Sequence, residues 1–229
     1  MSFIVIEGLD GSGKSTQLKM LRKYLEDNKI DYEYLHFPRT DSRIFGDLIA
    51  RFLRGELGDI NNVNPYLIAL IYAGDRNDAK EKINKWLSKD KLVIVDRYVY
   101  SNIAFQCAKL TDENDIEKLS EWIKDLEYNY FEIPKPALSI FLNVPFDFTR
   151  KNLTKQRAGD DRDYLNGKED IHEKDIDFQN KVRNVYLNEV KRDDRLKIIN
   201  CANEHGEMPQ AHEIFDKILN LLKSENILH

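Results

Sequence analysis

The chain has 229 residues, of which 41% are hydrophobic and 33% are charged, a balance typical of a folded protein and not of a disordered one. Its net charge of −5 argues against a nucleic-acid polymer as partner, because such partners bind basic surfaces. No apolar run reaches the about 18 residues of a membrane span, and the two cysteines lack metal-ligand spacing, so we expect neither a membrane partner nor a cysteine-bound metal.

Five short apolar segments are typical of buried β-strands. The first follows Met1 directly and leaves no room for a signal peptide, which predicts a cytoplasmic protein. We expect the strands at residues 2–7, 32–37, 92–95, 137–143 and 196–200.

Apolar residues recur with helical spacing between these segments. We expect the main helices at residues 14–28, 44–53, 65–87, 115–131, 175–190 and 208–222. Strands that alternate with helices indicate a parallel sheet covered on both faces. We therefore predict an α/β fold of three α/β/α layers, with a five-stranded parallel sheet and a single domain over residues 1–229. Ligands in such folds bind beyond the carboxyl ends of the strands, so we expect residues 8, 37–39 and 96–97 to meet there.

The first strand is followed by a loop with the spacing of a phosphate-binding motif. Residues 8–15 (GLDGSGKS) match G-x-x-x-x-G-K-[ST] between a buried strand and an amphipathic helix. Glycines let backbone N–H groups surround phosphate oxygens, Lys14 brings a positive charge that we expect to be solvated, and Ser15 offers a hydroxyl to Mg²⁺. The motif predicts a P-loop NTPase fold with an ATP site formed by Gly8, Gly11, Ser12, Gly13, Lys14, Ser15 and Thr16.

The third strand runs directly into Asp96 and Arg97. A carboxylate at a strand end opposite the P-loop is suited to hold Mg²⁺ or its waters. The planar guanidinium of Arg97 is suited to clamp phosphate oxygens. A surface ion pair is the alternative for these two residues.

The stretch from residue 150 to residue 174 is dense in charge and poor in apolar residues. Phosphoryl transfer needs positive charge over the transferring group and a closure that excludes water. We therefore predict a mobile lid over about residues 150–174, which carries Arg157 and Arg162. For any single arginine here, a solvated position is the alternative.

Five segments in this order and spacing resemble the thymidylate kinase family: IEGLDGSGKST, FPR, AGDR, DRYVYSNIAF and IPKP. The resemblance extends from Phe3 to about Tyr186. It implies phosphorylation of thymidine monophosphate (dTMP) to the diphosphate by ATP with Mg²⁺, for dTTP synthesis. It also implies a homodimer whose other partners are the small nucleotides ATP and dTMP.

The resemblance assigns roles near the phosphates and the sugar of dTMP. It implies that Asp10 contacts the sugar 3′-hydroxyl, directly or with help from the metal. It implies that Arg97 bridges the donor and acceptor phosphates, and that Phe37 and Arg39 line the acceptor site. Glu173 matches an acidic residue just after the lid, near the sugar and the metal.

The resemblance also assigns a reader of the thymine base. It implies that Tyr72 stacks near thymine and that Arg76 bonds its O4, and the spacing of these two residues puts them on one helix face. Asn102 matches the polar residue that reads the base edge, and Phe105 matches the ring that crowds the 2′ position. The alternatives are core aromatic residues for Tyr72 and Phe105, a helix cap for Asn102, and a surface ion pair for Arg76.

The P-loop departs from one variant of the family pattern. Some members carry a basic residue at the position of Gly11 or Ser12, and this chain does not. It therefore resembles the class that places catalytic arginines in the lid. Among Arg150, Arg157 and Arg162 we favour Arg157, which precedes Ala158-Gly159, and we rank Arg162 second.

Two other functions are open to a chain with a P-loop. A deoxynucleoside kinase needs a carboxylate base after the second strand and a later Glu-Arg-Ser triplet, but this chain has residues 37–39 (FPR) and 96–98 (DRY) there. A nucleotide-dependent binding module of the switch type needs N-K-x-D and D-x-x-G motifs, and neither is found at a suitable place. The sequence favours the monophosphate kinase over both.

Overall fold

The computed structural model describes residues 2–59, 62–153, 165 and 170–228. Five strands form one sheet in the order β2-β3-β1-β4-β5, and every pairing between neighbours is parallel. The predicted five-stranded parallel sheet is therefore confirmed. The strands are β1 (Phe3–Glu7), β2 (Tyr32–His36), β3 (Leu92–Asp96), β4 (Leu138–Asn143) and β5 (Leu196–Asn200).

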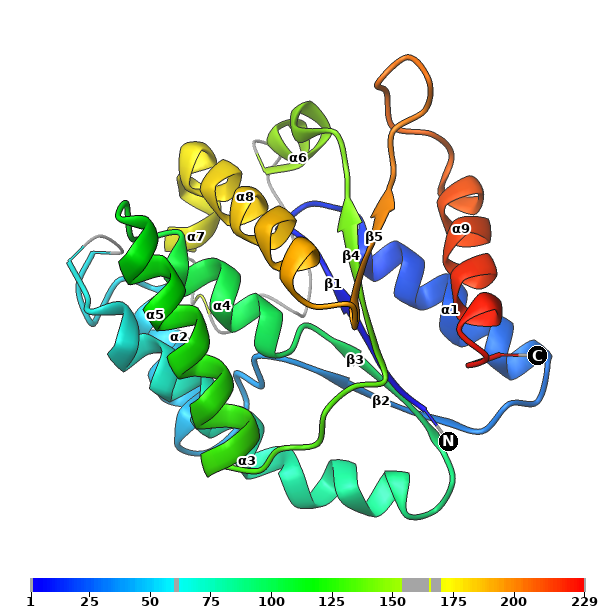
Figure 1. Ribbon diagram of the computed structural model, residues 1–229, viewed down its shortest axis with the longest axis horizontal. Coiled ribbons are helices and arrows are strands. Elements are labelled where there is room, and N and C mark those ends of the chain that lie inside the picture. The colour runs from blue at the N-terminus through cyan, green and yellow to red at the C-terminus, as the bar shows by residue number, and fades with distance from the viewer. Residues whose placement is uncertain (1, 60–61, 154–164, 166–169, 229) are drawn as a thin grey trace.

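Helices cover both faces of this sheet (Figure 1). Their bounds are α1 (Lys14–Asp27), α2 (Phe45–Leu53), α3 (Pro65–Leu87), α4 (Val99–Cys107), α5 (Glu113–Lys124), α6 (Phe146–Leu153), α7 (Ile171–Lys174), α8 (Ile176–Arg192) and α9 (Ala211–Ser224). A π-helical turn, η1 (Asp125–Tyr130), follows α5 directly. Within the described part of the chain, no helix is long and apolar enough to cross a membrane.

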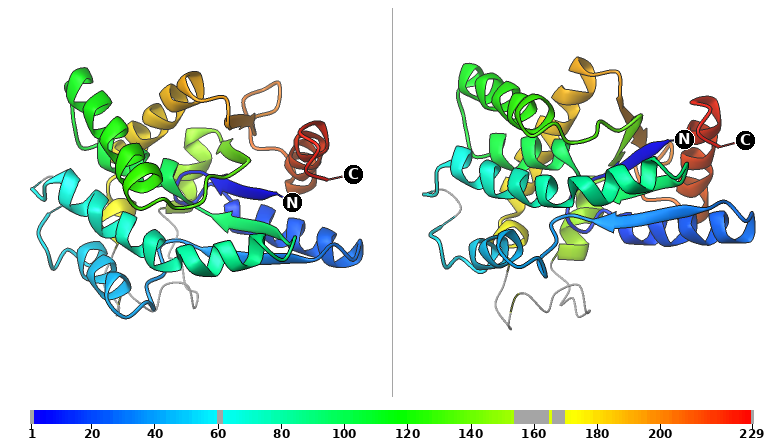
Figure 2. Two further views of the ribbon diagram at one scale, coloured as in Figure 1. Left: turned by 60° about the horizontal axis from the view of Figure 1, so that its bottom comes forward. Right: turned by 90° about the horizontal axis from the view of Figure 1, so that it is seen from below.

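The core is divided between the two faces by the alternation of side chains along each strand. Phe3 and Val5 of β1 belong to the cluster beneath α3, α4, α5 and α8. Ile4 and Ile6 belong to the cluster beneath α1 and α9, and Figure 2 shows these two helices side by side. Because β1 is buried over its whole length, the loop that follows it starts from a rigid base.

The start of α3 is set by local chemistry that can be read from the sequence. Asn64 precedes the helix and its side chain accepts a hydrogen bond from the backbone N–H of Tyr66, while Pro65 occupies the first turn. The predicted bounds of 65–87 are confirmed. The predicted helix over 115–131 is corrected, because α5 ends at Lys124 and the chain continues as η1.

Much of the predicted lid, residues 154–164 and 166–169, lies outside the described residues. The described parts of the stretch 150–174 are the end of α6 at 150–153, Leu165, and residues 170–174 with α7. The lid, like the single domain over residues 1–229, stays a prediction.

Candidate active site

The phosphate loop is shaped by the glycines that its motif requires. A Cβ atom at Gly8 would lie 2.8 Å from the Ser12 hydroxyl oxygen and 3.2 Å from the Lys14 Cγ, so any other residue would displace side chains of the loop. Gly13 has a φ of 83°, which favours glycine, and α1 begins at the next residue. The first N–H groups of α1 have no acceptor within the helix and so point at the loop with its positive end.

Lys14 is buried at 8% exposure, so the expectation of a solvated lysine is wrong. Its ammonium group donates to the backbone carbonyl of Leu9 at 3.2 Å. Burial and the nearby Arg97 guanidinium lower the pKa of Lys14 to about 8, although Asp96 and Asp10 oppose this shift. The loop therefore contains a positive charge that is shielded from water and that the oxygens of a triphosphate would stabilise.

Asp10 joins the phosphate loop to the end of β3. Its Oδ1 accepts from the Arg97 Nη2 at 2.6 Å and its Oδ2 accepts from the Gln179 Nε2 at 2.9 Å. Burial raises the pKa of Asp10, but the charges of Arg97 and Lys14 outweigh burial and lower this pKa to about 2. Asp10 is thus ionised at every physiological pH.

Arg97 is held in place from several sides. It has a φ of 65°, an unfavourable value for a residue with a side chain, at a position that is only 9% exposed. Nη1 donates to the Ser101 hydroxyl at 3.3 Å, and the guanidinium carbon lies 5.0 Å from the centre of the Phe105 ring. This placement contradicts the alternative of a surface ion pair.

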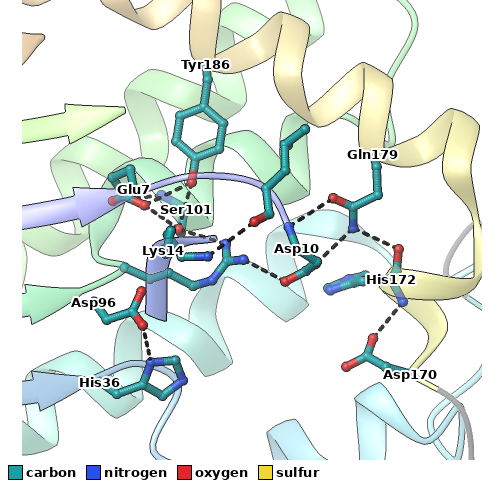
Figure 3. A network of polar contacts seen from close by, with 12 residues as sticks. Glu7, Asp10, Lys14, His36, Asp96, Ser101, Asp170, His172, Gln179 and Tyr186 are labelled. Atoms are coloured by element: carbon teal, nitrogen blue, oxygen red, sulfur yellow. Dashed lines mark hydrogen bonds and ion pairs between the residues drawn. The ribbon is translucent and has the colours of Figure 1, made fainter. Parts of the chain in front are cut away.

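A second carboxylate, that of Glu7, is buried and lies next to Lys14 and Arg97 (Figure 3). Glu7 is 0% exposed and accepts hydrogen bonds from the hydroxyls of Ser101 and Tyr186 and from the backbone N–H of Tyr98. Burial raises the pKa of Glu7, although Ser101 and Arg97 oppose the shift. The network ties β1 to α4 and α8.

Asp96 has the free oxygen that a magnesium site needs. Its Oδ2 lies 3.1 Å from the His36 Nδ1, whereas its buried Oδ1 has no hydrogen-bond partner. Burial raises the pKa of Asp96, but Lys14 and His36 outweigh burial and lower it, so the carboxylate is ionised. The described residues contain no cluster of three or more metal-binding side chains. One free carboxylate oxygen fits Mg²⁺, which is commonly held by one or two carboxylates together with substrate phosphates.

Arg76 and Tyr72 lie on one face of α3, one turn apart, as predicted. Arg76 is 2% exposed and forms two bonds to Glu127 in η1, so the alternative of a surface pair is wrong. Burial raises the pKa of the Tyr72 hydroxyl, with smaller effects from the charges of Asp170, Arg97 and Arg76. Tyr72 is half-buried and packs against the apolar cluster between α2 and α3.

Asn102 and Phe105 face this region from α4. The Asn102 Nδ2 donates to the backbone carbonyl of Ala69 in α3 at 3.0 Å, so Asn102 does not serve as a helix cap. Phe105 lies beside Arg97 and its ring centre is 5.0 Å from that of His172 in α7. The structure thus brings the predicted base readers of α3 and α4 together.

Arg39 and Phe37 are predicted to line the acceptor site, but the Arg39 side chain is bonded to carboxylates and the Phe37 side chain is buried. Arg39 bonds Asp75 through its backbone N–H and its Nε, and its Nη2 lies 2.6 Å from the Asp78 carboxylate. Phe37 precedes a cis Pro38 and is 1% exposed in the core beside Tyr98. The structure does place residues 37 and 96 together, because the Phe37 N–H donates to the Asp96 carbonyl at 2.9 Å.

Other predicted residues are only partly covered by the structure. Ser15 and Thr16 are exposed on the first turn of α1. Arg157 and Arg162 lie outside the described residues. Glu173 lies in α7, and its side chain is outside the described part.

Sequence reasoning missed three buried polar residues that hold the site: Glu7, Glu127 and Gln179. Two of them carry a signal that could have revealed them. Glu127 follows the buried Leu119 and Ile123 at a spacing of four, and Gln179 precedes the buried Val182 at a spacing of three. A charged or amide side chain on the apolar stripe of a helix indicates a buried partner.

Comparisons with known proteins agree with this geometry. The chain matches the family model described as thymidylate kinase over residues 6–211. It is 33% identical to a probable thymidylate kinase of Pyrococcus horikoshii over 225 residues, 97% of this chain and 96% of that protein. It is 33% identical to the thymidylate kinase of Plasmodium falciparum over 184 residues, 80% of this chain and 75% of that protein.

A solved structure shares the fold. The thymidylate kinase of Candida albicans superimposes with a TM-score of 0.71 at 21% identity, covering 99% of this chain and 92% of that one. Together with the family model and the relatives above, the arrangement of the phosphate loop, Arg97 and the α3–α4 residues leads to one conclusion: the chain belongs to the thymidylate kinase family.

Proposed function

We propose that this protein transfers the γ-phosphoryl group of ATP to dTMP, with Mg²⁺, and so supplies the diphosphate for dTTP synthesis. The observation that carries the proposal is the position of Arg97. It bonds Asp10 of the phosphate loop at 2.6 Å and also lies against Phe105 of α4. An arginine between a triphosphate loop and a nucleoside site suits an acceptor that already carries a phosphate.

The chemistry requires charge stabilisation rather than a general base. The acceptor oxygen of a monophosphate is already anionic at neutral pH, so no proton has to be removed before attack. Lys14, within the loop, and Arg97, bonded to Asp10 of the loop, supply positive charge around the transferring group. Asp10, ionised throughout, is suited to accept a hydrogen bond from the sugar 3′-hydroxyl.

The magnesium ion belongs to this proposal as a ligand of the triphosphate. Asp96, through its free Oδ1, and the Ser15 hydroxyl would hold it, with Asp10 nearby. When bound, Mg²⁺ would neutralise charge on the β- and γ-phosphates.

We also propose a cytoplasmic homodimer. Leu67 and Leu70 are 60% and 42% exposed on one face of α3, and Ile44 beside α2 is 63% exposed. Large exposed apolar side chains of this kind mark interaction surfaces when they lie together. Light scattering after size exclusion measures the mass of the particle, and a monomer at micromolar concentration would contradict the homodimer.

One assay tests the proposed reaction against its alternatives. ADP release is measured with ATP alone, with ATP and thymidine, and with ATP and dTMP, each with and without Mg²⁺. We expect release only with dTMP and Mg²⁺. Release with thymidine would indicate a nucleoside kinase, and release independent of any acceptor would indicate a nucleotide-hydrolysing module.

A further inference from the structure

Glu127 binds both of the side chains that are expected to read the base. It lies in η1 at 0% exposure. Its Oε2 accepts from the Arg76 Nε at 2.5 Å, and its Oε1 accepts from the Arg76 Nη2 at 2.7 Å. The same Oε1 accepts from the Asn102 Nδ2 at 2.9 Å. One buried carboxylate therefore holds a donor of α3 and a donor of α4 next to each other.

These bonds determine which way the Asn102 amide faces. Its Nδ2 has two hydrogens, and both are used, one on the Glu127 carboxylate and one on the Ala69 carbonyl. Both partners accept hydrogen bonds only, so a reversed amide would place oxygen against oxygen. The Asn102 Oδ1 is left as a buried acceptor without a hydrogen-bond partner. A buried acceptor of this kind requires an N–H group from a ligand or water.

Arg76 supplies the matching donor. Its bonds to Glu127 use Nε and Nη2 and leave Nη1 out of the pair. Because Arg76 and Asn102 both donate to the Glu127 Oε1, the two side chains are neighbours, and each keeps one group outside this contact: the Asn102 Oδ1 acceptor and the Arg76 Nη1 donor. This pair complements a base with an imide N–H next to a carbonyl, as in thymine and uracil. Cytosine presents an unprotonated ring nitrogen and an amino group in those places, which reverses the pattern.

We propose that Glu127 is a positioning residue that sets base specificity: it fixes the Asn102 amide with its oxygen toward the ligand and thereby selects pyrimidine monophosphates with an N3–H group over cytidylates. This inference rests on the proposed function. Glu127 does not touch the nucleotide itself and acts through Asn102 and Arg76.

Glu127→Gln tests the proposal with little change in shape. Glutamine offers an N–H₂ group that can face the oxygen of a reversed Asn102, so the acceptor is no longer fixed toward the ligand. We expect KM for dTMP to rise about tenfold while kcat changes less than about threefold, because a ground-state contact is lost. KM for ATP stays unchanged. The ratio of kcat/KM for dCMP to that for dTMP rises by about tenfold, since discrimination against the wrong hydrogen-bond pattern weakens.

Glu189→Gln is the matched control. Glu189 is also a buried glutamate, at 3% exposure, but it bonds Ser120 and Lys124 between α8 and α5. Its change to glutamine is expected to leave the dCMP to dTMP ratio as in the unchanged protein. A Glu127→Gln protein with the same KM and ratio as Glu189→Gln would overturn the proposal.

Glu127→Asp covers the case in which the glutamine variant does not fold. Aspartate still only accepts hydrogen bonds, so we expect a raised KM for dTMP with discrimination against dCMP retained. Relaxed discrimination in Glu127→Asp would also overturn the proposal. If the unchanged protein does not phosphorylate dTMP, the proposed function fails. If it does and the Glu127 variants behave like the control, only this inference fails.

Discussion

At the scale of single residues, Lys14 shows how the free protein is prepared for a triphosphate. Its charge lies where water hardly reaches, with one carbonyl partner and a pKa lowered to about 8. Folding therefore places this cation in a less favourable environment than the unfolded chain does. Phosphate oxygens supply the partners that the protein itself does not, so the cost of burial is recovered when the nucleotide binds.

Lys14→Ala should lower kcat by a factor of roughly hundreds, because charge stabilisation of this type is commonly worth about 3–4 kcal/mol. The free energy of unfolding should not fall, because a desolvated charge is removed. Steady-state kinetics and urea unfolding measure the two effects. Near-normal turnover would contradict the role of the phosphate loop.

Arg76→Ala should affect both recognition and stability. The change removes the proposed contact to the base, so KM for dTMP should rise more than KM for ATP. It also leaves Glu127 buried without its cation, which commonly costs roughly 3–5 kcal/mol. Kinetics and urea unfolding again separate the two effects, and equal changes in both KM values would indicate a structural role alone.

The double variant Arg76→Met/Glu127→Leu is the control for this prediction. An apolar pair removes the uncompensated charge, so stability should return toward that of the unchanged protein. Binding of dTMP should stay weak. Recovery of a normal KM for dTMP would show that Arg76 does not read the base.

At the scale of elements, α7 is fixed by one histidine between three helices. The His172 ring lies 5.5 Å from that of Phe52 in α2, 5.0 Å from Phe105 in α4 and 5.5 Å from Phe178 in α8. Burial, assisted by the nearby Lys109 ammonium, lowers the pKa of His172 to about 3. The histidine is therefore neutral in the folded protein at every pH above that value.

This lowered pKa predicts an acid-sensitive element. Above about pH 6.5 both the folded and unfolded chains hold a neutral His172, and the pKa shift has no effect on stability. As the pH falls from 6.5 toward 3, the unfolded chain gains a proton that the folded protein does not, so stability is lost. At pH 5 this loss amounts to roughly 2 kcal/mol, at about 1.36 kcal/mol for each pH unit.

His172→Phe tests this interpretation, because the aromatic packing is kept and the titration is removed. Urea unfolding at pH 7.5 and at pH 5 should show that the free energy of unfolding falls less between these pH values in the variant than in the unchanged protein. Asp10 does not interfere with this test, since its own contribution to the free energy of unfolding is lost only as the pH falls from about 4 toward 2. An unchanged dependence on pH would show that His172 is not the group responsible.

The elements also show what can be predicted from sequence. The five strands and the bounds of α3 follow from apolar runs, a side-chain cap and a proline, which are all local signals. The transition from α5 to η1 is not local: the spacing from Leu119 and Ile123 indicates that Glu127 is buried, but its bonding partners in α3 and α4 are far away in the sequence. The candidate site could be predicted at its strand ends, where topology alone brings residues together. For the buried residues that orient the site, spacing could reveal that Glu127 and Gln179 are buried, but not which partners they bind.

At the scale of the whole molecule, the question is which residues, besides Lys14 and Arg97, supply positive charge around the transferring phosphoryl group. Neither Gly11 nor Ser12 is basic, so under the proposed function Lys14, Arg97 and Mg²⁺ would carry the positive charge around the transferring group unless the segment 150–174 contributes. Arg150 lies in α6 and bonds Asp147 at 3.0 Å. Arg157 and Arg162 remain the candidates in that segment, outside the described residues.

Arg157→Ala should lower kcat by roughly a hundredfold or more and leave both KM values nearly unchanged, the pattern of a contact made mainly in the transition state. The melting temperature should hardly change, because Arg157 lies in a stretch that is rich in charged residues and poor in apolar ones. Arg150→Ala and Arg162→Ala are the controls. Normal kcat in all three variants would refute the lid hypothesis.

The order of strands in the sheet also determines when a growing chain can complete its phosphate loop. β1 leaves the ribosome first, but its neighbours are β3 and β4. Phe3 pairs with Val93 and Ile4 pairs with Leu138, so β1 lacks its second neighbour until more than half of the chain has been made. At synthesis rates of about 5–20 residues per second, this wait is on the order of ten seconds. During that interval the nascent chain carries an apolar strand with an open edge, a feature that makes incompletely folded chains prone to aggregation.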